Sequence, residues 1–141
     1  MLIMSEEYTL KYTESGGLTI AYQIWGSSED TLIYVPGMIS HLEAGLEDQD
    51  YLAWIRALSK FFRVIIFDKR GQGLSDRDAS APNLEERMDD ISSIVKAEQL
   101  DQFFLLGLSE GASISLIYAA TYPQKVKSVA VFGGTARFTK S

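Results

Sequence analysis

The amino-acid sequence predicts an α/β fold with a mostly parallel sheet, helices on both faces and an antiparallel hairpin at its N-terminal edge. Three observations carry this prediction. Four short, continuous apolar runs recur along the chain, as is typical of strands that are covered on both faces. Helical patterns alternate with these runs, and two segments of strand-like alternation precede them.

The two alternating segments predict the hairpin. Residues 8–12 alternate in the manner of a half-buried strand, and Gly16-Gly17 then marks a turn. Residues 18–25 alternate again and stop at Gly26. We therefore expect two antiparallel strands at the edge of the sheet.

Four strands of a parallel sheet are predicted at the apolar runs, which occupy residues 32–35, 64–67, 103–106 and 129–132. Helices are predicted over 51–60, 84–97 and 110–121, because apolar side chains recur there at helical spacing. Asn83 is a suitable N-cap for the second helix, and Glu85 and Glu86 suit its first turn. Pro123 follows the end of the third.

Composition narrows the class of protein. A chain of 141 residues, 46% hydrophobic and 23% charged, fits one globular domain, here residues 1–141. Its net charge of -6 argues against a nucleic-acid partner and against an anionic membrane surface. With no cysteine, disulfides and thiolate metal sites are excluded. Residues 1–7 resemble neither a signal peptide nor a membrane span, so we expect a cytoplasmic protein.

The segment Gly107-Leu108-Ser109-Glu110-Gly111 fits the pattern Gly-x-Ser-x-Gly. It follows a predicted strand and opens a predicted helix, which is the context that a nucleophile elbow requires. In such an elbow the serine has a strained backbone, and the glycines leave room where strand and helix cross. We expect Ser109 at the tip of this turn. The alternative is a glycine-rich helix start that only needs tight packing.

Together these features resemble the N-terminal, nucleophile-bearing half of an α/β-hydrolase. The resemblance runs from Tyr8 to Gly134 and rests on four segments in order, at residues 35–38, 67–76, 84–90 and 107–111. Residues 34–37, 67–71 and 84–90 are also similar to hydrolase-like domains found beside bacterial adenylate cyclase modules or helix-turn-helix regulators.

The resemblance implies roles for individual residues. Ser109 would be the nucleophile, and the backbone N–H of Glu110 would be one oxyanion donor. The second donor would come from the loop after Gly37, as the backbone N–H of Met38. This sequence has Pro36-Gly37 where many members of the family have His-Gly. A glycine at position 37 still permits the close backbone approach.

The rest of the family's catalytic machinery does not appear in this sequence. The order of the triad in the fold is Ser, then Asp or Glu, then His. Residues 133–141 contain neither an acid nor a histidine. We expect a truncated α/β-hydrolase domain without the cap and the last strands, either as a fragment of a longer hydrolase or as a short protein with a vestigial site.

Two functions of different classes follow. One is a serine hydrolase of the esterase type, which would act on a small ester-like substrate through an acyl-enzyme on Ser109 and need no cofactor. The other is a non-catalytic binding, sensor or assembly module that keeps the fold. The identity of the substrate cannot be read from the sequence, because the cap would shape the pocket.

His41 is the only histidine in the sequence. It lies four residues after Gly37, in the loop expected to line the mouth of the pocket. One interpretation makes it the general base for Ser109, which requires hydrogen-bond distance. The other makes it a residue of the loop or pocket wall, since the family's histidine comes from a loop after the last strand.

Three further patterns have ordinary structural explanations. Gly71-Gln72-Gly73 could begin a dinucleotide loop, but no helix start follows it, so a structural turn is expected. The acidic pairs 85–86 and 89–90 could be metal ligands, but a solvated helix face is expected instead. The two tryptophans, Trp25 and Trp54, suit the core or a pocket wall.

The last predicted strand suggests self-association. Residues 129–132 contain no proline and no inward charge, although Lys125 and Lys127 precede them. An edge strand of this kind is a template for pairing with another chain. We expect a homodimer in which this strand, or the helix 110–121 beside it, contacts its own copy. The alternative is that the last residues fold back over the edge.

Overall fold

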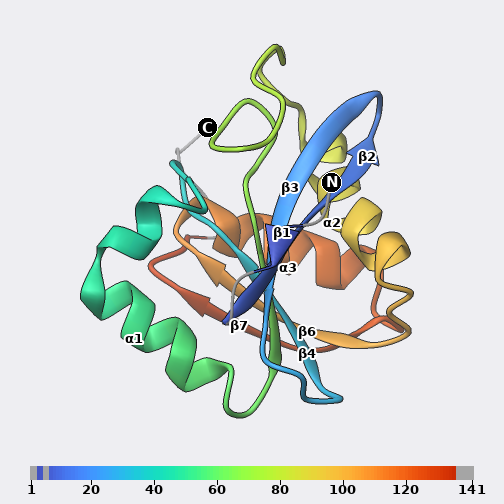
Figure 1. Ribbon diagram of the computed structural model, residues 1–141. Helices are drawn as coiled ribbons and strands as arrows, with labels where there is room; N and C mark the ends of the chain where they lie inside the picture. The colour runs from blue at the N-terminus through green and yellow to red at the C-terminus, as the bar shows by residue number, and fades with distance from the viewer. Residues whose placement is uncertain (1–2, 5–6, 136–141) are drawn as a thin grey trace.

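The computed structural model describes residues 3–4 and 7–135, with side chains from residue 7 onward (Figure 1). Its strands are β1 Ile3–Met4, β2 Tyr8–Ser15, β3 Leu18–Trp25, β4 Thr31–Val35, β5 Arg63–Phe67, β6 Phe103–Leu108 and β7 Val126–Phe132. In this part of the chain they form one seven-stranded sheet in the order β1-β2-β3-β5-β4-β6-β7. The predicted α/β fold is confirmed.

The antiparallel hairpin of β2 and β3 is confirmed, and its turn is built from glycines. Gly16 and Gly17 have φ angles of 59° and 83°, which glycine adopts without steric cost. The expectation that this hairpin forms the sheet edge needs correction, because β1 pairs antiparallel with β2 and lies outside it. A two-residue strand has too short a pattern to be recognised in the sequence.

The four strands predicted from the apolar runs are confirmed, and all of them run parallel to one another. β4 pairs with β5 on one side and with β6 on the other, and β6 pairs with β7. β5 also pairs antiparallel with β3, which joins the hairpin to the parallel strands. β7 begins at Val126, three residues before the predicted start, where a register shift occurs opposite Phe103. The carboxyl ends of β4, β5 and β6 therefore meet at one edge, where ligands bind in open α/β sheets.

The helices are α1 Gln49–Leu58, α2 Leu84–Ala97 and α3 Glu110–Thr121, with a short 3-10 helix η1 at Ala44–Glu47 that was not predicted. α1 begins two residues before its predicted start because the Asp48 side chain caps it, accepting from the N–H of Asp50 and Tyr51. α2 has its predicted bounds. Asn83 is its N-cap and forms a reciprocal capping box with Glu86.

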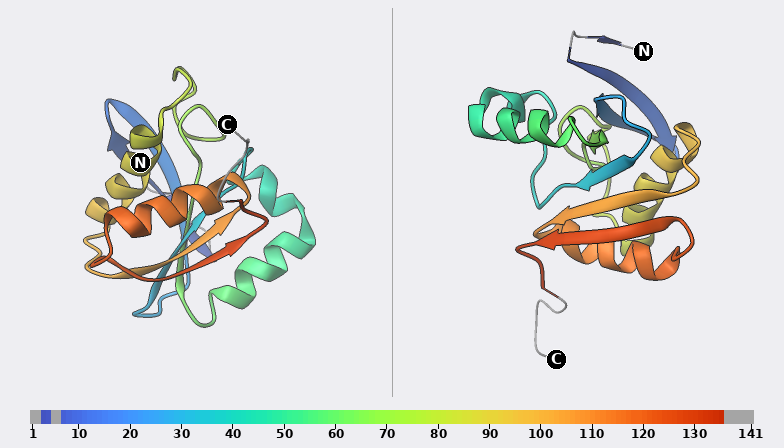
Figure 2. Two further views of the ribbon diagram at one scale, coloured as in Figure 1. Left: turned by 180° about the vertical axis from the view of Figure 1, so that it is seen from behind. Right: turned by 90° about the horizontal axis from the view of Figure 1, so that it is seen from below.

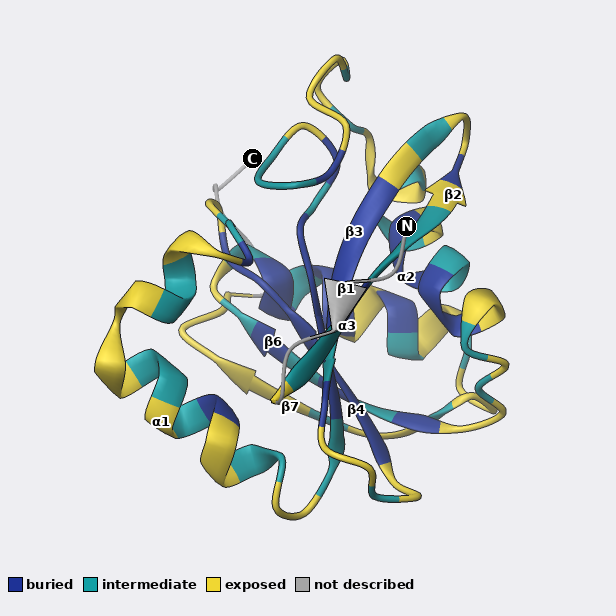
Figure 3. Cartoon of the chain, viewed as in Figure 1, coloured by how far each residue is buried: buried dark blue, intermediate teal, exposed yellow. Residues whose placement is uncertain are grey.

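Helices cover both faces of the sheet (Figure 2). On one face, Ile91 and Ile94 of α2 and Tyr118 of α3 pack against residues of β4, β5 and β6. On the other face, Ile55 of α1 packs against β3 and β5, and this cluster includes Trp25. β7, by contrast, is largely exposed (Figure 3). No helix within the described residues has the length and apolar character to cross a membrane.

Glu98, at the end of α2, ties three strands to that helix. Its carboxylate accepts hydrogen bonds from Lys11 on β2, from Tyr22 on β3 at 2.6 Å, and from Arg63 on β5. Burial alone would raise the pKa of Glu98, but these hydrogen bonds outweigh it and hold the pKa below its ordinary value. The folded state therefore favours the ionised carboxylate.

Candidate active site

Ser109 lies at the turn between β6 and α3, with φ 53° and ψ -118°. A positive φ is rare for a residue other than glycine, and it persists only where the surroundings enforce it. The Ser109 N–H donates to the carbonyl of Phe132 at 2.8 Å, and the Ser109 carbonyl accepts from Ala112 at 3.0 Å. The predicted strained turn is confirmed. The side chain is exposed and makes no capping hydrogen bond.

The two glycines of the motif are required by close contacts. A Cβ built on Gly111 would lie 2.2 Å from the carbonyl oxygen of Val35 and 2.4 Å from that of Pro36. A Cβ on Gly107 would lie 2.5 Å from the carbonyl oxygen of Gly111. These distances are far below van der Waals contact, so only glycine lets α3 cross β4 and β6 here. The expected collision of β-carbons is confirmed.

The loop after β4 passes beside the serine. A Cβ added to Gly37 would lie 3.4 Å from the Cβ of Ser109, which places the start of this loop in contact with the elbow. Neither the backbone N–H of Met38 nor that of Glu110 has an acceptor among the described residues. The N–H of Glu110 is also in the first turn of α3, where the helix dipole favours developing negative charge.

Polar side chains hold both of these segments. The carbonyl oxygen of Met38 accepts from Lys69 Nζ at 3.0 Å and from Gln72 Nε2 at 2.7 Å. The carboxylate of Glu110 accepts from Lys69 Nζ at 2.9 Å and from Arg87. Burial would raise the pKa of Glu110, but these two cations outweigh it and lower the pKa. This cluster lines a cavity of about 320 Å³ beside the elbow.

The segment after β5 braces the loop after β4 and its own turn. The buried carboxylate of Asp68 accepts from the N–H of Leu42 at 3.1 Å and from that of Leu74 at 2.8 Å. Gly73, with φ 53°, has no room for a side chain because a Cβ there would lie 2.0 Å from Asp68 Oδ2. Residues 71–73 form a turn that is followed by loop and not by a helix, in accord with the structural interpretation.

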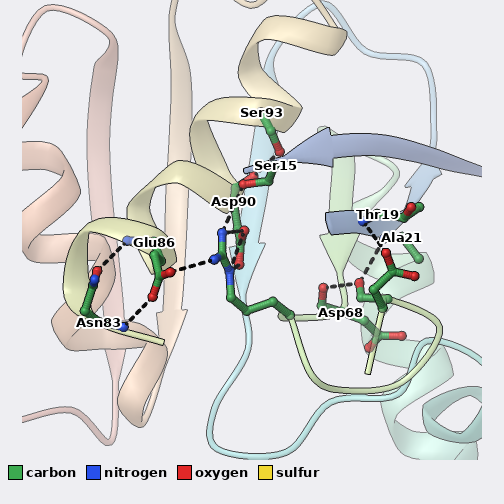
Figure 4. A network of polar contacts seen from close by, with 11 residues as sticks. Ser15, Thr19, Ala21, Asp68, Asn83, Glu86, Asp90 and Ser93 are labelled. Carbon is green, nitrogen blue, oxygen red and sulfur yellow. Dashed lines mark hydrogen bonds and ion pairs between the residues drawn. The ribbon is translucent and has the colours of Figure 1, made fainter. Parts of the chain in front are cut away.

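Part of the acidic face expected on α2 is in fact buried. Asp90 is 2% exposed and accepts from Arg70 Nε at 3.1 Å and from Arg70 Nη2 at 2.7 Å (Figure 4). Arg70 Nη2 also donates to the hydroxyl of Ser15. Asp89 and Glu85 are exposed as expected. The helical period alone cannot reveal this pair, since the arginine comes from a distant loop.

The structure does not bring His41 to Ser109. His41 lines a separate cavity of about 250 Å³ with Tyr51 and Asp68, and Ser109 is not among the residues of that cavity. The imidazole Nδ1 accepts the N–H of Ala44 at 3.3 Å. Among the described residues no hydrogen bond joins the side chains of His41 and Ser109.

An apolar pocket of about 440 Å³ lies on the α1 side of the elbow. Its lining includes Leu106 and Leu108 of β6, Phe132 of β7, Tyr34 of β4 and Trp54 of α1. Trp54 therefore lies in a pocket wall and Trp25 in the core, as expected. The sequence offers no signal for this pocket, because its residues come from four separate elements.

The strained Ser109 lies between β6 and α3, at the carboxyl edge of the parallel strands. This arrangement is that of proteins with a nucleophile elbow. The sequence profile described as alpha/beta hydrolase fold matches residues 30–140. The chain belongs to the α/β-hydrolase fold family, as the resemblance implied.

The relatives of this chain are serine hydrolases and esterases. The chain is 32% identical over 128 residues to the serine hydrolase BPHL of Mus musculus. This alignment covers 88% of this chain and 42% of that protein. Among solved structures, a hydrolase from Pseudomonas aeruginosa matches 92% of this chain and 48% of its own, with a TM-score of 0.81 and 24% identity. The esterase RhEst1 from Rhodococcus matches 89% of this chain and 46% of its own, with a TM-score of 0.75 and 25% identity. The chain thus spans less than half the length of these proteins.

Proposed function

We propose that this chain carries the nucleophile and the oxyanion hole of a serine hydrolase of the esterase type, with Ser109 as the nucleophile and a small ester as the substrate. The observation that carries the proposal is the positive φ of Ser109 at the turn between β6 and α3. Strain of this kind is stored at functional sites, where the surrounding contacts over-determine it. The relationship to serine hydrolases and esterases supports the same assignment.

In the proposed reaction, Ser109 Oγ attacks the ester carbonyl carbon. A C–O bond forms, the carbonyl π electrons move to oxygen, and the hydroxyl proton passes to a base. The backbone N–H groups of Glu110 and Met38 stabilise the resulting oxyanion. Collapse of this intermediate expels the alcohol oxygen with its electron pair, and water then hydrolyses the acyl-enzyme.

The 141 residues by themselves should form a weak esterase. Loss of triad members lowers kcat by roughly 10⁴-fold to 10⁶-fold, whereas the oxyanion hole alone retains part of the catalysis. Among the described residues no side chain accepts a hydrogen bond from the Ser109 hydroxyl, so we expect water to take the proton. Esters with a good leaving group, such as p-nitrophenyl acetate, reduce the need for a general acid and are the appropriate substrates.

The test compares p-nitrophenyl acetate hydrolysis by the wild type, Ser109→Ala and Ser80→Ala. Ser80 is exposed and lies outside the elbow, so its variant is the matched control. We expect slow acetylation of Ser109, detected as a mass increase of the intact protein, in the wild type and in Ser80→Ala only. Acetylation that persists in Ser109→Ala would contradict the assignment. Fast turnover by the wild type would instead indicate that a base is present.

The finer resemblance, to domains beside bacterial adenylate cyclases and helix-turn-helix regulators, supports a second candidate function. We propose as this alternative a binding or assembly module that forms a homodimer through β7. No strand within the described residues pairs with the outer edge of β7, and Val131 and Phe132 are 45% and 74% exposed. Two-fold antiparallel pairing centred on Val129 would place Lys127 opposite Val131, with no like charges in register.

Light scattering after size exclusion tests the alternative. We expect the mass of a dimer at tens of micromolar protein. Val131→Lys should dissociate it, because two lysines would then face each other across the strands, and Val131→Glu should be tolerated opposite Lys127. A monomer mass for the wild type would exclude the assembly function. Equal masses for the two variants would exclude this pairing of β7.

A further inference from the structure

Packing alone does not hold the loop that supplies one proposed oxyanion donor. The side chains of Met38 and Ile39 are 71% and 85% exposed, and β4 has already ended at Val35. The backbone at Met38 and Ile39 therefore has neither a strand ladder nor a buried side chain of its own, although Pro36, Gly37 and Leu42 on either side are buried. Donors in an oxyanion hole must be preorganised, because reorientation during the reaction would reduce the stabilisation of the charge.

Hydrogen bonds from the loop after β5 supply the missing constraint. Lys69 Nζ and Gln72 Nε2 both donate to the carbonyl oxygen of Met38, at 3.0 Å and 2.7 Å. The amide oxygen of Gln72 accepts from the N–H of Ser40 at 2.8 Å. These contacts fix the peptide group between Met38 and Ile39, which shares the α-carbon of Met38 with the peptide group that carries the donor N–H.

The same ammonium group reaches the elbow. Lys69 Nζ lies 2.9 Å from Glu110 Oε2, and the side chains of Lys69 and Glu110 are only 15% and 29% exposed. Arg87 binds the other carboxylate oxygen but has no described contact with the loop at Met38. Gln72 binds that loop but not Glu110. Among the described side chains, Lys69 is thus the one that joins both donor residues.

We propose that Lys69 is a positioning residue, whose ammonium sets the relative position of the two oxyanion donors by holding the carbonyl of Met38 and the carboxylate of Glu110 together. This inference rests on the proposed function, since it concerns the same oxyanion hole. Lys69 acts through the two donor residues and does not contact the reacting atoms. Displacement of one donor by about 1 Å can lower a rate by roughly a hundredfold.

The experiment follows reaction of Ser109 with an alkyl fluorophosphonate, in which the Oγ–P bond forms, the P–F bond breaks, and fluoride and the hydroxyl proton leave to solvent. The phosphoryl oxygen then occupies the oxyanion hole. Intact-protein mass spectrometry gives the maximal rate of labelling, kinact, and the half-saturating concentration, KI. The variants are Lys69→Met, which keeps the aliphatic stem, Lys69→Arg, which keeps the charge, and Lys60→Met as the control. Lys60 is an exposed lysine whose side chain has no described contact.

For Lys69→Met we expect kinact to fall about tenfold to a hundredfold with KI unchanged, since only an interaction of the transition state is lost. Backbone order parameters measured by NMR at Met38 should fall from about 0.85 to below about 0.6. Lys69→Arg should recover most of kinact, and Lys60→Met should match the wild type. If Lys69→Met does not fold, Glu110→Gln decides, because it keeps the N–H donor but removes the charge that Lys69 binds.

Wild-type labelling rates in Lys69→Met, or in Glu110→Gln if it is needed, would overturn the positioning role and leave the proposed function standing. A lower kinact with unchanged order at Met38 would also overturn it. A wild-type Ser109 that does not react at all would overturn the proposed function together with this inference, so the two failures are distinguishable.

Discussion

Breaking the buried ion pair between Arg70 and Asp90 should strongly destabilise the fold around the loop that carries Lys69. The Arg70 guanidinium makes three hydrogen bonds with the Asp90 carboxylate, at 3.1, 3.1 and 2.7 Å. The side chains are 5% and 3% exposed. At this burial, removal of one partner leaves the other charge desolvated and uncompensated.

The substitution Asp90→Asn keeps the shape of the side chain and removes its charge. Breaking a buried pair costs about 3–5 kcal/mol. We expect about 3 kcal/mol, the lower end of that range, because Glu86 Oε1 lies 3.4 Å from Arg70 and the Ser15 hydroxyl lies 3.2 Å from it. With a urea m-value of roughly 2 kcal/mol/M, the unfolding midpoint should fall by about 1.5 M.

Urea unfolding followed by tryptophan fluorescence measures this change. The control is Arg56→Met, which breaks the pair of Arg56 with Glu7 at 2.6 Å, a pair whose side chains are 50% and 45% exposed. Solvent screens such a pair, so the midpoint of the control should stay close to that of the wild type. A midpoint for Asp90→Asn no lower than that of Arg56→Met would refute the reasoning.

Three more predictions concern the elbow, the acid limit of stability and the histidine. Gly111→Ala should destabilise the fold by about 1–3 kcal/mol in urea unfolding, because its Cβ would lie 2.2 Å from the Val35 carbonyl oxygen. Alanine favours helices, so a stabilised variant would contradict the close packing at the elbow. The folded-state pKa of Glu98 is lowered, so its stabilisation is present above the unfolded pKa and is lost as pH falls through the folded pKa. Glu98→Gln should therefore make the unfolding midpoint less dependent on pH in the acid range. The same pH dependence of the midpoint in the wild type and the variant would exclude this role. His41→Ala should leave the rate of Ser109 acetylation unchanged; a large loss would identify His41 as the base.

Local signals in the sequence were sufficient for the fold and for the elbow. The apolar runs predicted β4, β5 and β6 because a strand covered on both faces needs apolar residues at most positions, and the same kind of run predicted β7 although β7 is largely exposed. Asn83 and the helical period predicted α2 with its observed bounds. The context of Ser109, a strand before it and a helix after it, predicted its strained backbone. Each of these features depends on residues that are close together in the chain.

Only the tertiary structure decided which charged residues are buried and which loops are held together. Asp90 was assigned to a solvated face because its partner Arg70 is 20 residues away. No sequence pattern predicts a role for Lys69, yet it joins Met38 to Glu110 across separations of 31 and 41 residues. Contacts of this kind form when the carboxyl ends of parallel strands meet at one edge of the sheet, so their partners are set by strand order and not by sequence spacing.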